Sequence, residues 1–148
     1  IGDYIDVQGE EGFVEDIQIF STIIRTFRNK TIYIPNGALS NGNIINISEK
    51  GNLRLDVEIG VDYASDIKQT KEVLVAAVEG IEGLLPTPAP SVVITELADS
   101  SINFKVFLWV TPETFYSVKA AAIENCKIAL DKAGIEIPYP HQVNISKK

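Results

Sequence analysis

The chain of 148 residues is 45% hydrophobic, contains one Cys, and carries 13 basic and 20 acidic side chains for a formal charge of −7. This hydrophobic fraction is too high for a disordered chain, and a single Cys excludes an internal disulfide framework and a Cys-rich zinc site. Because duplex nucleic acid is bound by Lys and Arg that displace counterions, the negative charge argues against a nucleic-acid partner.

The first fifty residues contain short segments with the composition and alternation of β-strands. Strands are predicted over residues 4–7, 13–19, 20–27, 31–34 and 44–47, the second of them bent near Glu15. Turns are expected at Gly9–Gly12, Asn36–Gly37 and Asn41–Gly42, the last two with positive φ. Five strands in so short a stretch predict a small five-stranded barrel, since a closed barrel leaves no strand edge exposed.

From about residue 51 the pattern changes to an alternation of strands and helices. Strands are predicted over residues 53–59, 91–97, 102–110 and 135–137, and a stiff connector over residues 86–90. Between the first two strands, Ser65 or Asp66 is placed to N-cap a helix. Its apolar residues recur at helical spacing as far as Ile81, so we expect Gly83 to end it.

A second helix is predicted after Thr111, with Pro112 at its first position and Gly134 at its end. Its apolar face is predicted to consist of Phe115, Val118, Ala122, Cys126, Ala129 and Ala133. The resulting order β-α-β-β-α-β is the split βαβ, or ferredoxin-like, arrangement. The sequence therefore predicts a mainly β part over residues 1–50, an α+β domain over residues 51–140, and a tail over residues 141–148.

The inventory of candidate catalytic residues is small. His141 is the only His, and no Ser or Cys motif stands beside it. Cys126 falls on the apolar face of the second helix, where the usual role is that of a small buried hydrophobic residue. The sequence contains no phosphate-binding loop, dinucleotide fingerprint, zinc spacing or calcium loop. We therefore expect no enzyme activity, no cofactor and no metal site.

The chain contains no Met and opens directly on a strand pattern, so we expect it to be a piece of a longer protein. Its longest uncharged run covers residues 31–48. That run contains one Pro, two Gly and four Asn, which would leave polar groups in hydrocarbon. We therefore expect no membrane-spanning segment within these residues.

Several short motifs resemble the small-conductance mechanosensitive channel (MscS) family in their order and spacing. In the first part these are Gly2-Asp3-Tyr4-Ile5, Gly12-Phe13-Val14, Ile34-Pro35-Asn36-Gly37 and Asn43-Ile44-Ile45-Asn46. In the second part they are Ile59-Gly60-Val61-Asp62-Tyr63, Ser101-Ile102-Asn103, and Gly134-Ile135-Glu136-Ile137-Pro138-Tyr139-Pro140. The resemblance covers essentially the whole chain, and the run of motifs in order is what makes it specific.

The resemblance implies an architecture and a function. Members of this family are homoheptamers in the bacterial inner membrane, and membrane helices precede the region seen here. The Sm-like β domain lies just under the membrane, and the α+β domains enclose a cytoplasmic vestibule with side portals. Such channels open under membrane tension and release ions and small solutes after hypoosmotic shock. The resemblance thus implies that this chain is the cytoplasmic vestibule of a channel.

Two groups of site residues follow from the resemblance. Pro35, Asn36 and Gly37 correspond to the part of the β domain that faces the end of the pore helix, so they are candidates for coupling the vestibule to the gate. A plain turn is the alternative. Val143 and Ile145 alternate with polar residues and are candidates for a strand of an axial barrel that stabilises the oligomer, with a frayed tail as the alternative.

A third group, Glu49, Lys50, Arg54 and Asp56, corresponds to the portal region between the two domains. Charges around a narrow, wet opening bias which ions pass through it. We therefore expect these four residues to line the portals, and a solvated surface without such a role is the alternative.

Two other functions fit parts of the sequence. The ferredoxin-like part is compatible with a soluble, oligomeric ligand-binding regulatory domain, which would require a polar pocket. A small five-stranded barrel also resembles Sm-like RNA-binding rings. The net charge of −7 and the lack of an aromatic and basic face argue against that function.

Overall fold

The computed structural model describes residues 1–138. The chain divides into two compact units, Ile1–Leu53 (unit 1) and a second that begins at Arg54 (unit 2). Unit 1 contains β1 (Tyr4–Val7), β2 (Glu10–Ile17), β3 (Ser21–Arg25), β4 (Thr31–Pro35), α1 (Asn36–Ser40) and β5 (Ile44–Asn46). The elements that follow are β6 (Leu53–Val61), α2 (Ile67–Val78), β7 (Ser91–Leu97), β8 (Ile102–Val110), the 3₁₀ turn η1 (Pro112–Thr114) and α3 (Phe115–Lys132).

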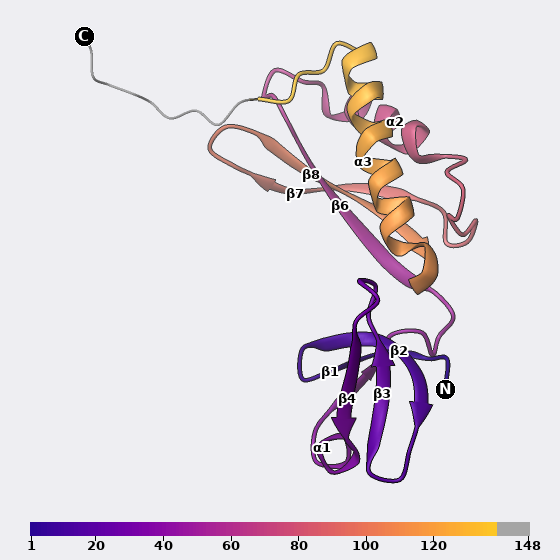
Figure 1. The fold of residues 1–148 in the computed structure, drawn as a ribbon. Coiled ribbons are helices and arrows are strands. Elements are labelled where there is room, and N and C mark those ends of the chain that lie inside the picture. Colours follow the sequence, from indigo (N-terminus) through magenta and orange to yellow (C-terminus); the bar gives the residue numbers. More distant parts are fainter. Residues whose placement is uncertain (139–148) are drawn as a thin grey trace. The chain divides into compact units, whose positions relative to one another are not determined.

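The strands of unit 1 form an antiparallel sheet in the order β4-β3-β2-β1-β5 (Figure 1). Strands β4 and β5 stand at the two ends of this order. The five strands over residues 1–53 therefore form an open sheet, and the predicted barrel closure is not observed. Ala38 and Leu39 of α1 pack against the apolar core, so this short helix, and not a β4–β5 pairing, covers part of that core.

The core of unit 1 is an apolar cluster drawn from four strands: Ile5, Val7, Val14, Ile24 and Ile34. Burying each such side chain stabilises the fold by about 1.5–3 kcal/mol. The register of β2 on β3 shifts between Val14 and residue 16, which confirms the predicted bend. A bulge of this kind increases the local twist, and it leaves the acidic residues 15 and 16 exposed.

The predicted turns of unit 1 are partly wrong. The turn between β1 and β2 lies at Gln8–Gly9, where both residues have positive φ, and not over Gly9–Gly12. Asn36–Gly37 begins α1 with ordinary helical geometry, and Gly42 also lacks a positive φ. The reason is that the Asn36 side chain is engaged by a distant loop and forms no local turn.

The sheet of unit 2 has the order β6-β8-β7, and α2 and α3 cover one of its faces (Figure 1). Alternate residues of β8 from Ile102 to Val110 are buried, as expected for a strand with one face against helices. The observed bounds of β7 and β8 equal the predicted ranges 91–97 and 102–110. The chain is therefore a mixed α/β protein with antiparallel sheets, and this confirms the predicted fold class at that level.

The helix caps explain where the helices of unit 2 begin and end. Asp66 caps α2 by accepting a hydrogen bond from the Gln69 amide at 3.1 Å, as predicted. The predicted end at Gly83 is wrong, because Gly80 already takes a positive φ after Val78 and stops the helix. The predicted Thr111 cap is confirmed in a capping box with Thr114 that precedes α3.

The predicted last strand, residues 135–137, is not a regular strand. Its backbone makes one contact with the end of β6, from the Asp62 amide to the Glu136 carbonyl oxygen at 2.9 Å. Pro138 follows and has no N–H to continue a ladder, which accounts for the failure to extend this pairing. Among residues 1–138, no helix is both long and apolar enough to cross a membrane.

Candidate functional site

Asn36 joins the start of α1 to the loop between β2 and β3. Its backbone N–H donates to the Phe20 carbonyl oxygen at 2.9 Å. Its side-chain Nδ2 donates to the carbonyl oxygens of Gln18 at 2.9 Å and Ile19 at 3.0 Å. A backbone hydrogen bond from Gln18 to Ser21 closes the loop at 2.8 Å. The loop is therefore held by Asn36 through all three of its central residues.

The same loop presents two apolar side chains to solvent. Ile19 is 86% exposed and Phe20 is 85% exposed, and we call these two residues the apolar tip. Two adjacent apolar side chains that are this exposed form a candidate contact surface. The hydrogen bonds of Asn36 fix the backbone that carries the tip, so Asn36 determines where the tip points.

The other two residues of the predicted coupling group have different surroundings. Pro35 is exposed at the end of β4, opposite Ser21 of β3. Gly37 is exposed, has no positive φ, and a Cβ atom added to it would meet nothing within 4 Å. Neither the backbone nor the packing of unit 1 therefore requires glycine at this position.

Of the predicted portal residues, the structure brings together Arg54 and Asp56. The guanidinium donates to both carboxylate oxygens of Asp56, at 2.8 and 3.1 Å, and its Cζ lies 4.2 Å from the centre of the Phe107 ring. Paired in this way, the two charges largely cancel. Glu49 and Lys50 are exposed at the end of unit 1, and no ion pair involves either of them within residues 1–138.

A further charge pair on the same face of the unit 2 sheet was not predicted. The Lys105 ammonium of β8 lies 4.0 Å from the Glu58 carboxylate of β6. The sequence indicated only that Lys105 is polar. Its partner could not be found without the pairing of β8 with β6, which brings residues 47 positions apart to the same face.

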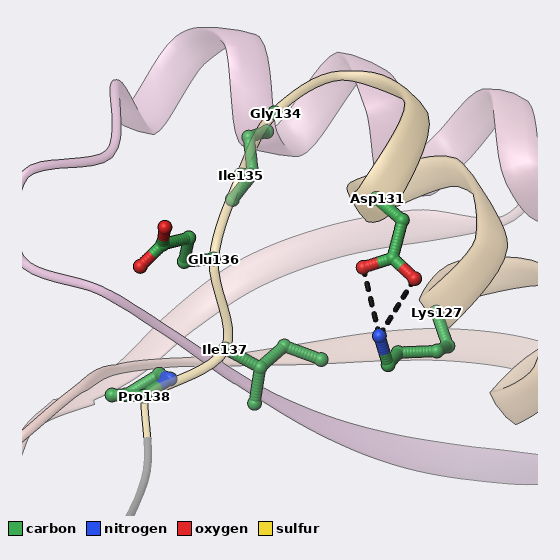
Figure 2. A pocket seen from close by; sticks show the side chains of 7 residues that line it. All are labelled: Lys127, Asp131, Gly134, Ile135, Glu136, Ile137 and Pro138. Atoms are coloured by element: carbon green, nitrogen blue, oxygen red, sulfur yellow. Dashed lines mark hydrogen bonds and ion pairs between the residues drawn. The ribbon is translucent and has the colours of Figure 1, made fainter.

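Figure 2 shows a hollow of about 630 Å³ at the end of α3, lined by Lys127, Asp131, Gly134, Ile135, Glu136, Ile137 and Pro138. The Lys127 ammonium lies between the two carboxylate oxygens of Asp131, at 2.7 and 2.8 Å. The positive charge in this hollow is thus already neutralised. The other charged residue that lines it is Glu136.

The described residues contain few candidate catalytic groups. Cys126 is buried in α3, and burial raises the pKa of its thiol to about 11. A thiol with such a pKa stays protonated near neutral pH and is a poor nucleophile. Within residues 1–138 there is also no group of three His, Cys, Asp or Glu side chains that could hold a metal ion.

Two family models match the chain in sequence order. The model described as "Mechanosensitive ion channel, beta-domain" matches residues 1–49, and "Mechanosensitive ion channel MscS, C-terminal" matches residues 55–137. The chain belongs to the MscS family. The family predicted from the motifs is therefore confirmed.

Individual relatives agree with this membership. An uncharacterised MscS family protein of Synechocystis is 39% identical over 142 residues, which are 96% of this chain and 48% of that protein. The small-conductance mechanosensitive channel of Edwardsiella ictaluri is 38% identical over 139 residues, 94% of this chain and 49% of that protein. The crystal structure of Helicobacter pylori MscS in its closed state matches with a TM-score of 0.86 at 32% identity, over 99% of this chain and 58% of that chain. The chain thus spans about half the length of the curated relatives it matches.

The remaining predicted site residues stay untested. Val143 and Ile145 lie outside the described residues, so their role in an axial barrel stays a prediction. The apolar tip was missed because Ile19 and Phe20 were assigned to strands, where such residues are usually buried. The sequence does contain one signal. The predicted strands 13–19 and 20–27 follow each other without a polar turn residue between them, so their junction at Ile19 and Phe20 is apolar.

Proposed function

We propose that this chain is the cytoplasmic part of a mechanosensitive channel that opens under membrane tension and releases ions and small solutes on hypoosmotic shock. The match of both units, in order, to the two MscS family models carries this proposal. Relatives named as small-conductance mechanosensitive channels, and a closed-state MscS structure, support it. The function is that of a conduit, and no enzymatic step is part of it.

The full-length protein is proposed to be a homoheptamer in the bacterial inner membrane, with this region on the cytoplasmic side. Residues 1–50 would form the β domain under the membrane, residues 51–140 the wall of a vestibule with side portals, and residues 141–148 a strand of an axial barrel. The exposed charge pairs on the uncovered sheet face of unit 2 are compatible with a wall beside a water-filled space. Native mass spectrometry of the full-length protein in detergent would give the subunit number.

A direct test of the channel function is rescue from hypoosmotic shock. The full-length protein would be expressed in a bacterial strain that lacks its own tension-gated channels, and survival after a rapid dilution of the medium would be counted. We expect survival well above that of the empty-vector strain. Equal survival, with the protein present in the membrane, would contradict the proposal.

Within this function, we assign Asn36 to coupling between the vestibule and the gate. It orients the apolar tip, Ile19 and Phe20, which carries the exposed apolar surface that such a contact needs. The proposed contact surface is the end of the pore-lining helix, in the membrane part of the full-length protein. Pro35 and Gly37 flank Asn36, and the open space at Gly37 leaves room for close approach of that helix.

The portal residues lead to a prediction about ion selectivity. Asp56→Asn should leave the Arg54 guanidinium uncompensated and shift the reversal potential of the full-length channel toward anion permeation. Arg54→Gln should shift it in the opposite direction, and the double variant should fall near the parent. The measurement is the reversal potential in excised patches across a salt gradient.

The control for the portal prediction is Asp131→Asn, which breaks a more exposed ion pair on α3 outside the proposed portal group. It should leave the reversal potential unchanged. Glu49 and Lys50 belong to the same proposed group, and Glu49→Gln should act in the same direction as Asp56→Asn. Parent-like reversal potentials in all the portal variants would mean that these charges are only a solvated surface.

A further inference from the structure

Thr22 of β3 is a buried polar residue with a single described side-chain partner. It is 4% exposed, and among residues 1–138 only Thr70 is a comparably buried polar residue. The Thr22 hydroxyl donates to the Asn36 Oδ1 atom at 2.7 Å. Thr22 is fixed by strand pairing on both sides, opposite Ile17 of β2 and Ile34 of β4. The pairing on both sides holds the backbone of Thr22 in place, and so limits where its hydroxyl can lie relative to Asn36.

The two loop carbonyl oxygens, which only accept, determine which way the Asn36 amide faces, and the Thr22 hydroxyl holds the amide in that orientation. An amide has one accepting oxygen and one donating NH₂ group. With Oδ1 toward the Thr22 hydroxyl, Nδ2 reaches the carbonyl oxygens of Gln18 and Ile19. The opposite orientation would place Oδ1 against those two carbonyl oxygens, where no hydrogen exists to bridge them. In the orientation that holds the loop, the Thr22 hydroxyl donates to Oδ1 and anchors the amide to β3.

Replacing the hydroxyl by a methyl group, as in valine, also removes room for the amide. A methyl group and an oxygen atom keep a separation of at least about 3.3 Å, whereas Thr22 Oγ1 and Asn36 Oδ1 are 2.7 Å apart. Valine at position 22 would therefore push the amide away from β3 and leave Oδ1 without a donor. Leaving a partly buried acceptor unpaired corresponds to a shift of about fivefold in favour of the released loop.

We infer that Thr22 is a positioning residue of the channel: by anchoring the Asn36 amide to β3, it sets the position of the apolar tip and so the tension at which the channel opens. This inference rests on the proposed coupling role of Asn36. The matched structure of a relative is in its closed state, and we take the tip position seen here as that of the closed channel. Release of the tip then favours opening.

The test is patch-clamp recording of the full-length channel at a fixed membrane tension below the parent's midpoint. Thr22→Val should raise the open probability about fivefold, with unchanged single-channel conductance. Thr22→Ser keeps the hydroxyl and should restore the parent value. Thr22→Ala, which removes the hydroxyl without crowding the amide, replaces Thr22→Val if that variant fails to assemble.

The matched control is Thr70→Val. Thr70 is fully buried in α2, and its hydroxyl donates to the Asp66 carbonyl oxygen at 2.7 Å, remote in sequence from the loop. An equal shift in Thr70→Val would show a general loss of stability and overturn the inference. A parent-like Thr22→Val beside a shifted Asn36→Ala would overturn the role of Thr22 alone. If Thr22→Val and Asn36→Ala both behaved like the parent, the proposed coupling role of Asn36 would be overturned.

Discussion

Asn36→Ala should open the full-length channel at lower membrane tension than the parent. The substitution removes the hydrogen bonds to the carbonyl oxygens of Gln18 and Ile19, and it leaves the buried Thr22 hydroxyl without its acceptor. One backbone bond from residue 36 to the loop remains. The tip is then no longer held in the position assigned to the closed state. A lost contact of about 1 kcal/mol changes a two-state equilibrium about fivefold, so the open probability at a fixed subthreshold tension should rise by at least that factor.

A companion to this prediction is the substitution Gly37→Ala, in the same coupling group. A Cβ atom at Gly37 meets nothing within 4 Å, and its φ is not positive, so unit 1 should lose no stability. Asn36→Ala is expected to shift the open probability through the apolar tip. Gly37→Ala leaves the tip held by Asn36 and tests whether the pore-lining helix needs the open space at Gly37. If Asn36→Ala assembled in parent amounts and its gating were unchanged, the coupling role would be contradicted, and residues 35–37 would be a plain turn without a role in gating.

The sequence was sufficient where structure depends on neighbours along the chain. The bounds of β7 and β8, the Asp66 cap and the Thr111 capping box all arise from local alternation or from side chains within a few residues. The prediction failed where two local signals compete. Gly80 and Gly83 can each end α2, and both have positive φ, but the nearer one ended the helix.

The buried face of α3 shows the limit of spacing arguments. Val118, Ala122 and Cys126 were predicted to be buried and are, but the row continues to Leu130, which was not predicted. The predicted row continued instead to Ala129, which is half-buried. Both continuations fit a helical period, and only the packing against the rest of unit 2 distinguishes them.

Only part of the candidate site could be predicted from the sequence. The family motif singled out Asn36, but its partners lie 14 to 18 residues away and are brought to it by the register of β2, β3 and β4. The exposure of Ile19 and Phe20 contradicts the usual preference of apolar residues for the interior. Contacts set by strand register and the exposure of apolar residues at a loop are the two features that local patterns do not contain.

Gly12→Ala should substantially destabilise unit 1 and lower the yield of assembled channel. A Cβ atom at Gly12 would lie 2.7 Å from the Arg25 carbonyl oxygen and 3.0 Å from its carbonyl carbon. Both are backbone atoms of β3, so no side chain can turn aside to relieve the contact, and β2 and β3 must separate locally. Overpacking of this kind costs about 1–3 kcal/mol. The measurement is the temperature at which the purified, detergent-solubilised oligomer dissociates on heating, read by size-exclusion chromatography.

The position of Gly12 gives this prediction a second consequence. It lies beside the Phe13–Arg25 pair, at the end of β2 and β3 opposite to the loop that carries the tip. Channels that do assemble with Gly12→Ala should therefore open at parent tension, in contrast to Asn36→Ala, which should assemble and gate abnormally. Gly42→Ala is the control for adding a methyl group, because its nearest neighbours would be at 3.5 and 3.6 Å, an ordinary contact. If Gly12→Ala dissociated at the parent temperature, the close approach of β2 to Arg25 would not be a constraint on the fold, and the glycine of this motif would need another explanation.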